Sequence, residues 1–192
     1  MSKKILVEVS ARHIHISRKY LDILFGKGFV LTKLKDLSQL NEFAAKETVN
    51  IISRAGKIIE NVRILGPERE ETQIEISLTD SYFLKEDVPI RQSGDLENSA
   101  PIKLVGPLGE IDLDYGMIVA KRHFHCTKET AKELNIDNDS IVMFKVEGER
   151  ALIFDNLLVR ITDDAVDRIH IDTDEGNACS IKGDVFSEII FN

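Results

Sequence analysis

The chain has 192 residues, of which 43% are hydrophobic, and a formal net charge of −8. This length and composition support one large or two small folded domains and argue against a disordered chain. The acidic balance argues against nucleic acid as a partner, and no apolar run approaches the ~20 residues that a membrane-spanning helix needs.

Taken in chain order, most of the sequence predicts strands. Residues 5–9 and 72–77 alternate between apolar and polar side chains, and residues 54–57 separate two apolar runs in the pattern of a hairpin. Short helices are predicted at 18–25, with Ser17 as N-cap, and at 128–134, with Thr127 as N-cap. The acidic segment 172–177 is predicted to be a turn. Many short strands with frequent turns favour a barrel or a sandwich. Further strands are predicted at 102–105, 111–113, 117–122, 141–146, 151–154, 157–161, 169–171 and 187–191.

All five histidines lie in three short segments, as the pairs His13 and His15, His123 and His125, and the single His170. Residues two apart on a strand point to the same face, so each H-x-H pair can present two imidazoles to one side. Imidazole is the commonest metal ligand in proteins, although a lone histidine is more often a packing or surface residue. Five imidazoles exceed the ligands of one tetrahedral zinc, so two metal ions are expected. Zinc suits such a set, and the sequence leaves cobalt, iron and manganese open.

The two histidine pairs also form an internal repeat. Segments 10–18 and 119–128 both read Arg-His-x-His-x-Ser/Thr followed by a basic residue and a predicted helix. This match predicts two related half-structures that face one site.

Other side chains extend the hypothesis of a metal-dependent site. Glu75 lies between two isoleucines and is the best carboxylate ligand, although a solvent-facing role is the ordinary alternative. Arg63 and Arg69 flank a Gly-Pro turn, and a guanidinium suits phosphate oxygens, but they could equally be surface residues. Cys126 and Cys179 form no C-x-x-C motif, so structural roles in a reducing cytoplasm are expected.

Several separated motifs, in this order, resemble the PduL-type phosphate acyltransferases, the phosphate propanoyltransferase family. The resemblance covers nearly the whole chain. It departs from the family pattern at Gly176, where alanine is usual, and at Cys126, where methionine is common. The matching motifs are V-S-A-R-H-I-H-I-S (9–17), L-T-K-L-K-D-L-S-Q (31–39), V-R-I-L-G-P (62–67), T-Q-I-E-I-S (72–77), S-G-D (93–95), A-K-R-H-F-H (120–125) and H-I-D-T-D-E (170–175).

The resemblance implies a mainly β fold of two tandem β-barrel domains capped by short α-helices. Residues 12–120 would form the central barrel. Residues 121–192, completed by the N-terminal strand 1–11, would form the second, with the site between the two. The family's bacterial-microcompartment members, which act in propanediol degradation, often carry an amphipathic leader. None is evident here, so a cytoplasmic enzyme is expected.

The activity implied is the reversible reaction of acyl-CoA with phosphate to give acyl phosphate and coenzyme A, with acetyl or propanoyl as the acyl group. Two zinc ions are implied, one held by His13 and His15 and the other by His123, His125, His170 and Glu75. Arg69 matches the family's phosphate-binding arginine. The coenzyme A site would comprise Ser10, Lys35, Arg63, Leu65, His170 and Asn177.

Two alternatives remain open at this stage. A dinuclear metallohydrolase could act on thioesters through a metal-bound hydroxide, and a non-catalytic metal-binding protein would need neither arginine. A strand near the C-terminus could support a homodimer.

Overall fold

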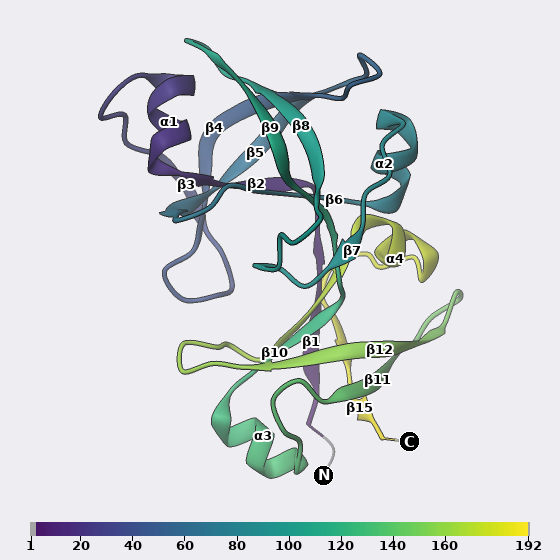
Figure 1. The fold of residues 1–192 in the computed structure, drawn as a ribbon. Helices are drawn as coiled ribbons and strands as arrows, with labels where there is room; N and C mark the ends of the chain where they lie inside the picture. The colour runs from purple at the N-terminus through teal and green to yellow at the C-terminus, as the bar shows by residue number, and fades with distance from the viewer. Residues whose placement is uncertain (1–2, 192) are drawn as a thin grey trace. The chain divides into compact units, whose positions relative to one another are not determined.

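The computed structural model describes residues 3–191, and by their contacts these form two compact units (Figure 1). We call them the central unit, Arg12–Leu37 with Asn41–Ala120, and the terminal unit, which holds the residues up to Ala11, the short segment Ser38–Leu40, and the residues from Lys121 onward. The described residues are mainly β, with two barrel-like sheets and four short helices, which confirms the fold class expected from the sequence.

The central unit is built on an eight-stranded sheet in the order β3-β4-β5-β2-β6-β9-β7, with β8 paired to both β4 and β9. That double pairing closes β4, β5, β2, β6, β9 and β8 into a ring. Helix α1 follows the strand that carries His13 and His15, and α2 follows the strand that carries Glu75. The elements are β2 (His13–Ser17), α1 (Arg18–Phe25), β3 (Lys33–Asp36), β4 (Phe43–Ile52), β5 (Ile58–Arg69), β6 (Gln73–Ile76), α2 (Leu78–Leu84), β7 (Ile90–Arg91), β8 (Ala100–Val105) and β9 (Glu110–Ala120).

The terminal unit is built on a seven-stranded sheet in the order β14-β1-β13-β10-β12-β11-β15. The two ends of this sheet, β14 and β15, are separated in the chain by Glu188 alone, so the sheet closes on itself. The elements are β1 (Ile5–Ser10), β10 (His123–Cys126), α3 (Lys128–Leu134), β11 (Ile141–Val146), β12 (Leu152–Ile161), β13 (Arg168–Asp172), α4 (Thr173–Ala178), β14 (Val185–Ser187) and β15 (Ile189–Ile190).

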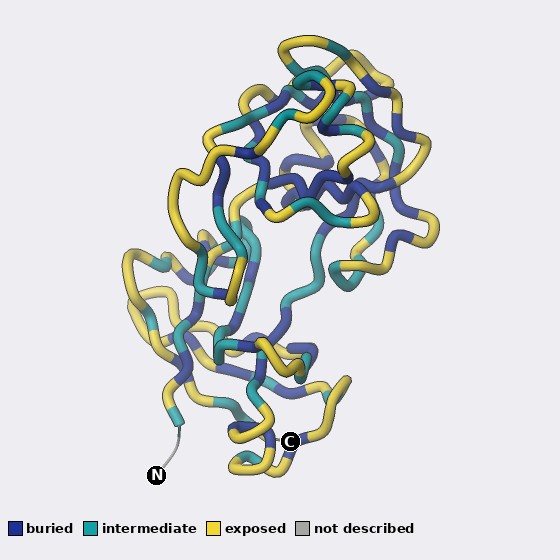
Figure 2. Tube along the Cα trace, turned by 90° about the vertical axis from the view of Figure 1, so that its left-hand side faces the viewer, coloured by how far each residue is buried: buried dark blue, intermediate teal, exposed yellow. Residues whose placement is uncertain are grey.

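Each unit has its own hydrophobic core, and buried stretches alternate with exposed turns along the chain (Figure 2). In β2, Ile14 and Ile16 are fully buried in the central core. In β10, Phe124 and Cys126 are fully buried in the terminal core. Because side chains alternate along a strand, the histidines of both strands are turned to the opposite face.

Both predicted helices are confirmed at their predicted bounds, Arg18–Phe25 and Lys128–Leu134. The predicted hairpin is also confirmed, since Ile52 pairs with Ile58 across the turn, where Gly56 takes a φ of +71°. Its left-handed backbone is one that glycine adopts without steric cost.

The prediction of a turn at 172–177 is wrong, because residues Thr173–Ala178 form α4. Helix α2 was not predicted at all. Both helices begin with a capping box, Ser77 with Asp80 and Asp172 with Glu175, which satisfies amide groups that a short helix leaves unpaired. No helix in the described part of the chain has the length and apolar character needed to cross a membrane.

Candidate metal centres

The first candidate centre lies in the central unit, where β2 presents His13 and His15 on one face. Both side chains are buried, with 6% and 4% of their surface exposed. Their Nε2 atoms lie 3.2 Å apart, so the two imidazoles aim at one point. Two buried imidazole nitrogens this close form a natural pair of metal ligands.

The third member of this centre is Glu75, which pairs directly with His13 in the antiparallel ladder of β2 and β6. Its Oε2 atom lies 3.5 Å from His13 Nε2, and one potential ligand atom from each of the three residues falls within 4.8 Å of the others. The resemblance implied that Glu75 joins the other three histidines, whereas the strand pairing puts this carboxylate beside His13 and His15.

The second candidate centre lies in the terminal unit and consists of His123, His125 and His170. The Nε2 atoms of His123 and His125 are 3.0 Å apart, and His170 pairs directly with His123 in the antiparallel ladder of β10 and β13. The potential ligand atoms of the three histidines again lie within 4.8 Å of one another. Two imidazoles with one carboxylate, and three imidazoles, are both ligand sets that hold zinc while leaving a fourth position for a substrate or water.

Neighbouring groups orient the imidazoles of the second centre. His123 Nδ1 donates to the carbonyl oxygen of Lys121 at 3.0 Å, which leaves the Nε2 lone pair available for a cation. His170 Nε2 lies 3.0 Å from Oε2 of Glu8, and the same Glu8 oxygen accepts a hydrogen bond from Ser38 Oγ at 2.5 Å. Burial raises the pKa of Glu8, but the hydrogen bonds from His170 and Ser38 outweigh burial and leave the pKa below its ordinary value. Glu8 is therefore an ionised carboxylate that anchors the His170 ring.

Electrostatics favour a neutral imidazole at His15. Burial lowers its pKa well below the ordinary value, and electrostatic interactions with His13 and Arg69 lower the pKa further, while the interaction with Glu75 raises it in part. A metal binds the neutral form of imidazole, so His15 needs to lose no proton at neutral pH.

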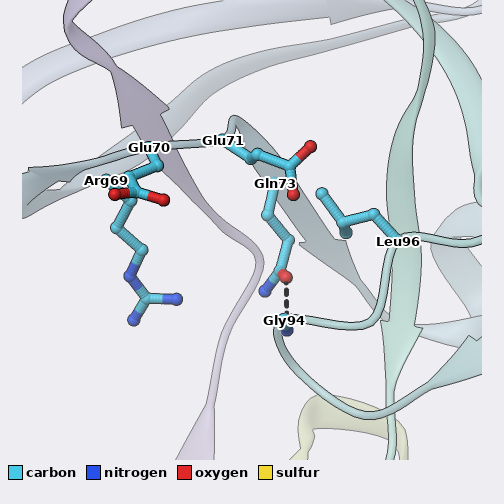
Figure 3. A pocket seen from close by; sticks show the side chains of 6 residues that line it. All are labelled: Arg69, Glu70, Glu71, Gln73, Gly94 and Leu96. Carbon is cyan, nitrogen blue, oxygen red and sulfur yellow. Dashed lines mark hydrogen bonds between the residues drawn. The ribbon is translucent and has the colours of Figure 1, made fainter.

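Gln73 joins Glu75 to the loop that carries the S-G-D motif. Its Nε2 donates to Glu75 Oε1 at 2.5 Å and to Ser93 Oγ at 2.9 Å. Its Oε1 accepts from the backbone N–H of Gly94 at 2.7 Å, the hydrogen bond drawn in Figure 3. All the polar atoms of this side chain are engaged, which restrains the rotamers of both Gln73 and Glu75. This role of Gln73 was not predicted from the sequence, although Gln73 stands two residues before Glu75 on the same face of one strand.

Arg69 lines a cavity of about 170 Å³ at the end of β5. Its Nη2 atom donates to Glu42 Oε1 at 2.9 Å, and 36% of its side-chain surface is exposed. Such a partly exposed guanidinium is accessible to an anion. The cavity is lined by Arg69, Glu70, Glu71, Gln73, Gly94 and Leu96 (Figure 3).

The residues expected to contact coenzyme A fall into both units. In the central unit, Arg63 and Leu65 pair with His13 and His15 in the parallel ladder of β2 and β5, so they lie next to the first centre. Lys35 lies exposed on β3 of the same unit.

Two hydrogen bonds restrain the side chain of Arg63. Its Nη1 atom donates to the carbonyl oxygens of Ala45 at 3.0 Å and Lys46 at 2.7 Å.

In the terminal unit, Ser10 pairs with Asp172 at the end of β13, two residues beyond His170. Asn177 is exposed on α4, one residue after Gly176. A Cβ atom at Gly176 would lie 2.7 Å from Val9 Cγ2, so the glycine lets α4 approach β1 closely. That approach brings Asn177 to the same end of the sheet as Ser10.

The sequence matches a family model described as phosphate propanoyltransferase over residues 6–182. The chain belongs to the phosphate propanoyltransferase family. Curated relatives with that description include proteins from Clostridioides difficile, 49% identical over 96% of this chain and 88% of the relative, and from Thermotoga maritima, 47% identical over 92% and 84%. A protein of the same description from Enterococcus faecalis is 46% identical over 91% of this chain and 82% of the relative.

Membership of this family confirms the resemblance and supports an acyltransferase that uses phosphate. It does not favour the metallohydrolase or the non-catalytic metal-binding protein.

Proposed function

We propose that this chain catalyses the reversible transfer of an acetyl or propanoyl group between coenzyme A and inorganic phosphate, and that it depends on two zinc ions. The observation that supports zinc most directly is the presence, in each unit, of three potential ligand atoms within 4.8 Å of one another. The donor sets fit zinc, and the family description names the phosphate and the propanoyl group. When bound, the ions supply positive charge that stabilises a departing thiolate and a developing oxyanion.

Arg69 is proposed to hold the phosphate. A planar guanidinium can donate two parallel hydrogen bonds to phosphate oxygens, which leaves the remaining oxygens free to react. In the forward reaction a phosphate oxygen attacks the thioester carbonyl carbon. The new C–O bond forms, the C–S bond breaks, and one proton of the phosphate ends on the released thiol.

The cysteines support direct transfer without an acylated enzyme. Burial raises the pKa of Cys126 to about 12 and also raises the pKa of Cys179 above its ordinary value. Both thiols are buried, and a thiol is nucleophilic only as the thiolate. We therefore propose a ternary complex of enzyme, acyl-CoA and phosphate.

A thiol-release assay with acetyl-, propanoyl- and butanoyl-CoA tests the proposed function. We expect release to require phosphate, to stop when a chelator removes the metal, and to resume when zinc is restored. The product should be acyl phosphate, detected as a hydroxamate. Free acid as the main product would show a hydrolase instead, and isotope exchange between phosphate and acyl phosphate without coenzyme A would rule out direct transfer.

The choice of acyl chain is part of the same test. Acetyl and propanoyl differ by one methylene, which is worth ~1–3 kcal/mol in a closely fitting pocket. We expect both chains to be accepted, with a preference that kcat/KM measures.

A further inference from the structure

An arginine precedes each H-x-H pair, and each arginine is tied to a helix elsewhere in its unit. Arg12 donates from Nε to Asp80 Oδ2 at 2.9 Å, and its Nη2 lies 2.9 Å from Asp80 Oδ1. Arg122 donates from Nε to Glu175 Oε1 at 2.5 Å and from Nη1 to the carbonyl oxygen of Asp155 at 2.6 Å. The carboxylate partners are the equivalent residues of two short helices, α2 and α4.

Both carboxylates belong to capping boxes. Asp80 accepts from the backbone N–H of Ser77 at 3.3 Å, and Ser77 Oγ accepts from the N–H of Asp80 at 3.2 Å. Glu175 and Asp172 make the same reciprocal pair at 3.0 and 2.8 Å. Each carboxylate therefore joins an arginine on the H-x-H strand to the first turn of a helix.

The capping residues stand two positions after the third ligand of each centre. Ser77 follows Glu75, and Asp172 follows His170. Each arginine thus connects the segment that carries two ligands to the segment that carries the third, through one carboxylate and one helix cap.

In each unit, a second hydrogen bond joins a residue that follows the H-x-H pair to a residue that precedes the third ligand. Thr72 Oγ1 accepts from the N–H of Ser17 at 2.9 Å, and Asp167 Oδ1 accepts from the N–H of Thr127 at 2.8 Å. Thr72 and Asp167 each stand three residues before the third ligand, and Ser17 and Thr127 stand two residues after the second histidine of their pair. The repeat visible in the sequence at the H-x-H segments therefore extends in three dimensions to the third ligand and its supports.

We infer that Arg12 and Arg122 are positioning residues, each of which sets the distance between the H-x-H pair and the third ligand of one metal centre. The inference rests on the proposed function, since it requires that the two centres bind metal. Asp80 is 7% exposed, so removal of Arg12 leaves a buried carboxylate without its counter-charge, and the capping segment next to Glu75 must adjust. Metal affinity responds to such changes because the ligand atoms must be held to within ~0.5 Å.

The test is a titration of the metal-free protein with Co²⁺, followed by visible absorption and by competition with a chelator. We expect the wild-type protein to bind two equivalents. Arg12→Gln should lower the affinity for one of these cobalt ions by about 10–100-fold and alter the absorption spectrum of that bound ion, as is typical when a residue that supports a ligand is lost. Arg122→Gln should weaken the other equivalent by a similar factor. The variants His15→Ala and His125→Ala each lack one ligand of one centre, so they identify which cobalt spectrum belongs to which centre.

The matched control is Arg54→Gln. Arg54 also makes a two-pronged ion pair with a buried carboxylate, Glu86, at 3.3 and 2.9 Å, but Glu86 follows the C-terminal end of α2 and neither residue belongs to the candidate ligand groups. We expect Arg54→Gln to lower thermal stability without changing either cobalt site. The double variant Arg12→Gln, Asp80→Asn should lose little more affinity than Arg12→Gln alone, because the two side chains act as one unit.

The outcomes distinguish an error in the proposed metal centres from an error in the proposed role of the arginines. If the wild-type protein binds no cobalt, the proposed metal centres are wrong and the positioning role falls with them. If the wild-type protein binds two equivalents and Arg12→Gln behaves like Arg54→Gln, the positioning role is wrong while the metal centres stand. Should Arg12→Gln fail to fold, Arg12→Lys keeps the charge without the two-pronged contact and must show the same selective weakening.

Discussion

Replacement of Arg69 by alanine should weaken the use of phosphate while leaving the metal content unchanged. Arg69 belongs to neither group of candidate ligands, and it lines the cavity near Gln73 and Gly94. The substitution removes a guanidinium at the end of β5 without opening the hydrophobic core, since Arg69 is partly exposed. The expected change is therefore confined to anion binding.

The size of the effect follows from two competing interactions of the guanidinium. Its ion pair with Glu42 joins side chains that are 36% and 30% exposed, and pairs of this kind contribute only ~0–1 kcal/mol. Charge-assisted hydrogen bonds to phosphate contribute ~1.5–3 kcal/mol. We therefore expect phosphate to displace Glu42 from the Arg69 guanidinium. The loss of Arg69 should raise the KM for phosphate by about 10–100-fold, since ~1.4 kcal/mol corresponds to a factor of ten.

The assay is initial-rate kinetics with varied phosphate at saturating acyl-CoA, together with zinc content by elemental analysis. Glu42→Gln is the matched variant, because it removes the competitor and keeps the guanidinium. Its KM for phosphate should stay equal to the wild-type value or fall by up to about fivefold. An unchanged KM for phosphate in Arg69→Ala would show that another group holds the anion.

Three further predictions follow from the contacts and the pKa shifts. Gln73→Leu removes the 2.5 Å hydrogen bond to Glu75 and should weaken the binding of one of the two metal ions by about tenfold in chelator competition. Wild-type affinity at both centres would contradict this. The hydrogen bonds from Arg54 lower the pKa of Glu86 below its ordinary value of 4.5. This carboxylate therefore stabilises the fold fully above pH 4.5 and loses that contribution as the pH falls through the lowered pKa, so urea unfolding should show Glu86→Gln less stable than wild type at pH 7 and the gap closing at lower pH. With a pKa of about 12 and a buried thiol, Cys126 should resist iodoacetamide at pH 8 until the protein is unfolded, whereas rapid labelling of the native protein would reopen a cysteine mechanism.

Local patterns in the sequence predicted those parts of the molecule that depend on near neighbours. The alternation in the H-x-H segments placed two imidazoles on one face and apolar side chains on the other, and β2 and β10 have this arrangement. Ser17 and Thr127 marked the starts of two helices. All four helices are too short to stand out by periodicity, and the seven-residue α2 and the six-residue α4, unlike α1 and α3, were not recognised from their N-caps. The capping boxes at Ser77 and Asp172 were the signal available for them.

By itself, then, the sequence determined that two pairs of imidazoles would be presented on strands, because residues two apart on a strand share a face whatever the rest of the chain does. Only the tertiary structure decided which third side chain completes each set. Glu75 joins His13 and His15 because β6 pairs with β2, and His170 joins His123 and His125 because β13 pairs with β10. The same pairings bring Arg12 to Asp80 and Arg122 to Glu175. Strand register between segments far apart in the chain depends on the packing of the whole sheet, and no local pattern specifies it.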